Sequence, residues 1–91
     1  MSEMKFRERL PVVSAMQFDG SFQSSNRILN WVWGRGETDA SALICADGVR
    51  LVIPTPDGPT AVGIGDWVVR GNGEFQICKQ DVFTKRYEAV E

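Results

Sequence analysis

Basic and aromatic side chains alternate along the second half of the chain, and this mixture suggests a binding site. Aromatic rings stack on nucleobases and cationic side chains neutralise phosphates, so the pattern favours a nucleotide-like ligand. The candidate residues are Arg50, Arg70, Lys79 and Arg86 as charge partners and Trp67, Phe75 and Tyr87 as stacking partners. The alternative is a solvated sheet face, on which Arg50 and Arg70 point away from the core and nearby carboxylates dilute the positive field.

Two glycine-rich segments could present backbone amides to a phosphate. They are residues 63–66, Gly-Ile-Gly-Asp, and residues 71–73, Gly-Asn-Gly. A nucleotide-binding loop of this type opens a helix, and the nucleotide motif also carries Lys-Ser or Lys-Thr. Both segments here precede strand-like residues, so we interpret them as tight turns between strands.

The residue types argue against catalysis and metal binding. The chain contains no histidine, which excludes Ser-His-Asp and Cys-His arrangements and removes the commonest general base. Cys45 and Cys78 are too few for a metal site and are expected to be small buried thiols in a reducing compartment. We predict a protein that is not an enzyme and uses no cofactor or metal. An enzyme based on carboxylates, lysine or tyrosine is the minor alternative.

Length and charge restrict the class of protein further. The chain has 91 residues, 43% of them hydrophobic and 24% charged, which predicts a single domain spanning residues 1–91. Its core must be thin, so a homo-oligomer is expected. The net charge is −2, so the chain lacks the excess of basic residues that is typical of proteins that bind duplex DNA. Since no apolar run has the length of a membrane span or a signal peptide, we expect a cytoplasmic protein that does not bind membranes.

Three turn dipeptides predict β-hairpins, namely Asp47-Gly48, Asp57-Gly58 and Asn72-Gly73. Apolar or β-branched residues flank each of them, as in hairpin strands. Strands are therefore expected at residues 11–18, 42–46, 49–53, 67–70, 74–79 and 82–88. Three prolines, Pro54, Pro56 and Pro59, are expected to end the strand at residue 53 and to shape the second turn.

Residues 24–33 follow a helical period. Ile28, Leu29 and Val32 fall on one stripe, Ser24, Ser25 or Asn26 can cap the start of the helix, and Gly34 can end it. Trp31 and Trp33 point about 200° apart on a helix, so one of them should be exposed. The predicted fold class is α+β: mainly antiparallel sheet, or a small partly closed barrel, of about five or six strands with one short helix.

Several segments resemble a family of small bacteriophage and prophage proteins. The resemblance covers the N-terminal strand and the C-terminal third, and rests on Arg9-Leu10-Pro11-Val12-Val13, Gln17-Phe18-Asp19-Gly20, Gly65-Asp66-Trp67-Val68-Val69, Gly73-Glu74-Phe75, Cys78-Lys79, Phe83 and Tyr87-Glu88. The chain departs from the pattern at Gln76, where an aromatic residue is expected, and at Gln80, where a proline is expected. The resemblance implies a phage-encoded protein in the cytoplasm of an infected bacterium, acting on host machinery or host defence.

Three functions follow as hypotheses. The first is a homo-oligomeric binding module that sequesters a nucleotide-like host signal through the seven basic and aromatic residues. The second is a protein-interaction module that binds a host or phage protein through the exposed tryptophan of the helix. The third is a small RNA-binding barrel, which the acidic net charge disfavours.

Overall fold

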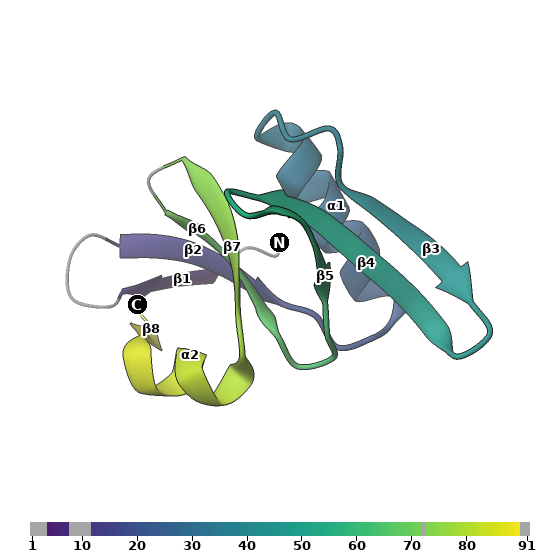
Figure 1. The fold of residues 1–91 in the computed structure, drawn as a ribbon. Helices are drawn as coiled ribbons and strands as arrows, with labels where there is room; N and C mark the ends of the chain where they lie inside the picture. Colours follow the sequence, from purple (N-terminus) through teal and green to yellow (C-terminus); the bar gives the residue numbers. More distant parts are fainter. Residues whose placement is uncertain (1–3, 8–11, 72, 90–91) are drawn as a thin grey trace.

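The computed structural model describes residues 4–7, 12–71 and 73–89, which form eight strands and two helices (Figure 1). The α+β class with mainly antiparallel sheet is confirmed, and the strands divide between two open sheets. Five of the six expected strands are present, and three short ones, β1 (Met4–Arg7), β5 (Gly58–Val62) and β8 (Glu88–Ala89), bring the number in the described residues to eight.

The first sheet has five antiparallel strands in the order β7-β6-β2-β1-β8. Its centre is β2 (Val12–Gln17), and β6 (Trp67–Gly71) and β7 (Glu74–Cys78) form the expected hairpin. Gly73 turns this hairpin with φ of +79°, a conformation that glycine adopts without strain. Asn72 and the predicted strand's first residue, Pro11, lie outside the described residues.

The second sheet is the antiparallel meander β3 (Ser41–Cys45), β4 (Gly48–Thr55) and β5. The expected turns at Asp47-Gly48 and Asp57-Gly58 are confirmed. The prediction that prolines end the strand at residue 53 is wrong, because β4 continues through Pro54, which pairs with Pro59. Pro54 is tolerated since β3 pairs with β4 only as far as Val52, so no strand on that side needs its missing N–H.

Helix α1 (Phe22–Gly34) begins two residues before the predicted helix. The predicted cap at residues 24–26 is wrong, because Ser21 caps the helix and its side chain accepts a hydrogen bond from the Ser24 amide. The predicted stripe is confirmed, with Ile28, Leu29 and Val32 all buried. The expected difference between the tryptophans is also confirmed, as Trp31 is 8% exposed and Trp33 is 44% exposed.

The segment that leads into α1 predicts a specific pH dependence. Hydrogen bonds from the Ser21 and Ser24 hydroxyls and from the Ser21 amide lower the pKa of Asp19 to about 2. This folded-state pKa is below the unfolded value, so the contribution of Asp19 to stability is present above about pH 4 and is lost as the pH falls towards about 2. Urea midpoints of wild type and Asp19→Asn should therefore differ at neutral pH and converge over this range. A difference that stays constant down to pH about 2 would contradict this role of the ionised carboxylate.

The first sheet is covered on both faces. A main core joins one of its faces, with Val68 and Phe75, to α1 and to Leu51 and Ile53 of the second sheet. A small core covers the opposite face, where Ala15, Trp67 and Val69 pack with Phe83 of α2 (Gln80–Arg86).

The strand predicted at residues 82–88 is therefore wrong, and most of this segment forms α2. Phe83 and Tyr87 are four residues apart, so a helix brings them to one side, and their rings lie 4.8 Å apart. Asp81 in the first turn and Lys85 and Arg86 in the last turn also favour a helix through its dipole.

Candidate functional site

The seven residues predicted to bind a ligand do not lie together. Trp67 belongs to the small core and Phe75 to the main core, so these two rings lie on opposite faces of the first sheet. Arg50 is in the second sheet, where it is exposed opposite Leu43. It lines a separate hollow of about 250 Å³ with Asp47 and Ile64. No single ligand of nucleotide size can use all seven residues in this arrangement.

Trp67 and Tyr87 hold α2 on the sheet. The Trp67 ring stacks on Phe83 with centroids 4.1 Å apart and planes 4° from parallel, and Phe83 contacts Tyr87 in turn. The Arg86 guanidinium lies 5.7 Å from the centre of the Tyr87 ring. Because Trp67 is only 9% exposed, its ring is used for packing and not for stacking on a base.

Cys78 and Cys45 are free and half-buried, less enclosed than expected. Cys78 packs against the small core beside Trp67 and Phe83. This burial raises the pKa of the Cys78 thiol, which keeps it in the less reactive protonated form.

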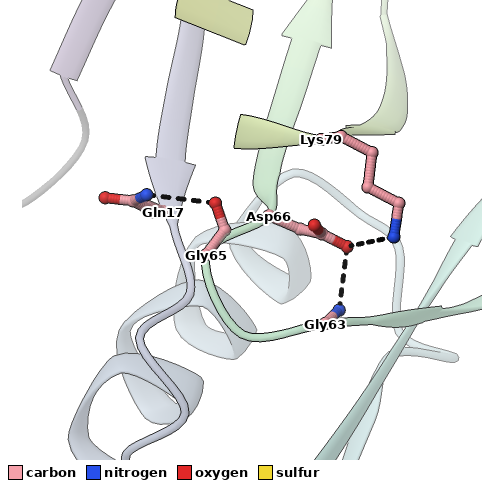
Figure 2. Close-up of polar contacts among 5 residues, drawn as sticks. All are labelled: Gln17, Gly63, Gly65, Asp66 and Lys79. Carbon is pink, nitrogen blue, oxygen red and sulfur yellow. Dashed lines mark hydrogen bonds and ion pairs between the residues drawn. The ribbon is translucent and has the colours of Figure 1, made fainter. Parts of the chain in front are cut away.

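Lys79 neutralises a buried carboxylate in the turn before β6 (Figure 2). Its Nζ lies 3.6 Å from Asp66 Oδ2, and the Lys79 side chain is 74% exposed while that of Asp66 is 8% exposed. The same carboxylate oxygen accepts a 3.0 Å hydrogen bond from the Gly63 amide. Gln17 donates to the Gly65 carbonyl at 3.0 Å, which ties the turn to β2. The Gly63–Asp66 segment is thus the expected tight turn. The Asp66 carboxylate accepts the hydrogen bond from the Gly63 amide, so this amide is not available to a phosphate.

Arg70 and Phe75 pair across the β6–β7 hairpin on the main-core face. The Arg70 guanidinium lies 5.3 Å from the centre of the Phe75 ring, and Trp31 meets that ring edge-on with centroids 5.2 Å apart. Phe75 is 2% exposed, so it offers no open ring face. Within the described chain, Trp31 Nε1 and Arg70 Nε are buried without a hydrogen-bond acceptor.

The structure contains a groove that we did not predict from the sequence. Two hollows of about 210 and 360 Å³ lie between the β4–β5 hairpin and β7, and both are lined by Thr55 and Pro56. We call them together the β7 groove. Its other lining residues are Glu37, Pro54, Asp57, Thr60, Gly73, Glu74, Phe75, Gln76 and Ile77.

The β7 groove is acidic and lies along a sheet edge. Its carboxylates are the exposed side chains Glu37, Asp57 and Glu74, and none of its described lining residues is a lysine or arginine. Strand β7 is the last strand of the first sheet among the described residues, so part of its backbone has no strand partner. No short motif signals this site, because proline and glycine residues from two distant turns form it only when the two sheets pack.

A second sheet edge is apolar. Strand β3 carries no charged residue and no proline, and it exposes Leu43 at 62% and Ile44 at 77%. The β3–β4 hairpin extends past α1 (Figure 1). The exposed Trp33 adjoins this edge, since its indole N–H donates to the Ala40 carbonyl at 2.9 Å. Edges of this kind are usually protected by charge or proline in proteins that remain monomeric.

These features define a class, an α+β domain of two antiparallel sheets with an acidic groove where they meet. No protein-family model, curated protein sequence or solved structure matches the chain. No helix in the described ranges is long and apolar enough to cross a membrane. The same residues contain no group of three or more histidine, cysteine, aspartate or glutamate side chains placed to hold a metal ion.

Proposed function

We propose that the protein is a non-enzymatic binding module whose ligand site is the β7 groove. The observation that carries this proposal is the groove itself, which combines apolar side chains at Pro54, Pro56 and Ile77 with three carboxylates and the outer edge of β7. Concave sites of a few hundred Å³ with a small number of polar groups are typical of ligand sites. The resemblance to phage and prophage proteins supports a ligand in the bacterial cytoplasm.

The charge of the groove favours a protein partner over a nucleotide, at a surface other than the exposed Trp33 of the second hypothesis. A phosphate site requires cations that converge on one point. The four candidate cations lie apart, each beside a different residue: Arg50 opposite Leu43, Arg70 over Phe75, Lys79 at Asp66 and Arg86 over Tyr87. The groove offers the opposite charge at Glu37, Asp57 and Glu74. A polyanion in the groove would therefore be repelled.

We further propose that two copies assemble through β3. An antiparallel strand edge is complementary to itself across a two-fold axis, and β3 presents Leu43 and Ile44 for that contact. We expect the wild type to be a dimer and the double substitution Leu43→Lys with Ile44→Lys to be a monomer by light scattering. The matched control is Ile64→Lys, since Ile64 is 78% exposed but lies outside β3. A monomeric wild type, or a control that dissociates equally, would contradict assembly through β3.

The test of the groove as the ligand site is an amide-resolved NMR titration with three probes of different classes. The probes are a hexapeptide of alternating lysine and valine, a hexapeptide of alternating glutamate and valine, and ATP. At least one probe should shift the amides of Thr55, Thr60 and Gln76 more than those of β3. The variant Gln76→Trp, which places a larger side chain at a residue that lines the wider hollow, should weaken that binding. If all three probes leave the groove amides unchanged, the proposed site is wrong.

A further inference from the structure

The outer edge of β7 lies in a groove whose two walls offer different interactions. On the hairpin wall, Thr55 Oγ1 and Thr60 Oγ1 both donate to the Gly58 carbonyl, at 2.9 and 3.0 Å, and lie 3.1 Å apart. These hydroxyls are thus engaged within the hairpin, and Pro54 and Pro56 have no N–H. The hairpin wall therefore offers mainly packing, while β7 supplies backbone hydrogen bonds.

Side chains of β7 alternate between two environments. Phe75 and Ile77 pack into the main core, whereas Glu74 and Gln76 are exposed on the opposite side of the strand. A strand added to β7 would place its own side chains alternately beside Phe75 and Ile77 and beside Glu74 and Gln76. The first set favours apolar residues and the second favours a cation opposite the Glu74 carboxylate.

Charge complementarity then selects the occupant. Glu37 and Asp57 extend the negative charge of Glu74 along the groove, and the described lining contains no cation that would neutralise them. We propose that the β7 groove binds an extended, basic segment of a partner protein as an added strand, with lysine or arginine alternating with apolar residues. This inference names the ligand class and rests on the proposed function that the groove is the binding site.

The test is a binding titration of the lysine–valine hexapeptide followed through backbone amide shifts. Shifts are expected at residues 73–77, and the affinity should fall as salt is added. The same peptide with its valines replaced by proline should not bind, because proline cannot supply the strand hydrogen bonds. The glutamate–valine hexapeptide should not bind either.

Charge reversal identifies the residues responsible. Glu74→Lys and, separately, Glu37→Lys should each weaken binding of the lysine–valine peptide about tenfold, since both residues line the groove. Asp47→Lys makes the same change of charge in the β3–β4 turn and should leave the affinity unchanged. All three positions are exposed, and the urea midpoint of each variant verifies that it is folded.

The outcomes separate the two proposals. If the glutamate–valine peptide or ATP shifts the groove amides and the lysine–valine peptide does not, the groove is a ligand site and the basic-segment inference is wrong. If no probe shifts them, the proposed function fails as well. Weakening by Asp47→Lys equal to that by Glu74→Lys would show attraction to net charge only, and would also overturn the inference.

Discussion

Replacing Phe83 with alanine is expected to lower the free energy of unfolding by about 3–5 kcal/mol, because it removes a buried aromatic ring from a small core. Phe83 is 2% exposed and is the buried residue of α2. Its ring stacks on Trp67 and contacts Tyr87, so the substitution removes the contacts that hold α2 against the sheet. A chain of this size has little stability in reserve, and a loss of this size would leave much of it unfolded.

The measurement is urea unfolding followed by tryptophan fluorescence and by circular dichroism. Val82→Ala is the matched control, since Val82 is the neighbouring residue of α2 and is 47% exposed. The control should change the midpoint little. If Phe83→Ala and Val82→Ala shift the midpoint equally, the ring stack does not anchor α2.

Asp66→Ala is expected to cost about 1–3 kcal/mol, since it leaves the Gly63 amide without its acceptor in the turn before β6. The Asp66 side chain is 8% exposed, and its Oδ2 accepts the Gly63 amide at 3.0 Å (Figure 2). The Lys79 pair adds less, about 0–1 kcal/mol, because the Lys79 side chain is mostly in solvent. The carboxylate therefore acts mainly as a hydrogen-bond acceptor for the turn.

Two further variants separate these contributions. Asp66→Asn keeps an oxygen that can accept from the Gly63 amide, so it should cost much less than Asp66→Ala. Lys79→Ala should be close to neutral in urea unfolding. A loss of stability in Lys79→Ala as large as that in Asp66→Ala would show that the ion pair dominates the turn.

Local features of the sequence were sufficient to predict the hairpins and the helix. Asp47-Gly48 and Asp57-Gly58 specify turns through glycines whose φ values are +132° and +104°. The stripe of Ile28, Leu29 and Val32 specified the buried side of α1. These signals are short in range, so they do not depend on the rest of the fold.

Features that depend on long-range packing were missed. The run from Val82 to Tyr87 contains β-branched and aromatic residues that are typical of strands, but its aromatic residues are spaced for a helix that packs on Trp67. The sequence also could not show that Trp67 and Phe75 face opposite sides of one sheet, which separated the predicted binding residues. The β7 groove depends on contact between two sheets whose strands are distant in the chain, so spacing alone did not reveal it.

Amide hydrogen exchange across β7 is the direct test of strand addition at the β7 groove. It should be measured for residues 74–78 with and without the lysine–valine hexapeptide, using Asp47→Lys and Glu74→Lys as matched variants. Added-strand binding predicts slower exchange of the outward-facing β7 amides in wild type and in Asp47→Lys, and little change in Glu74→Lys. Unchanged exchange in β7, or protection confined to β3 or to the Arg50 hollow, would contradict the assignment of the β7 groove as the binding site.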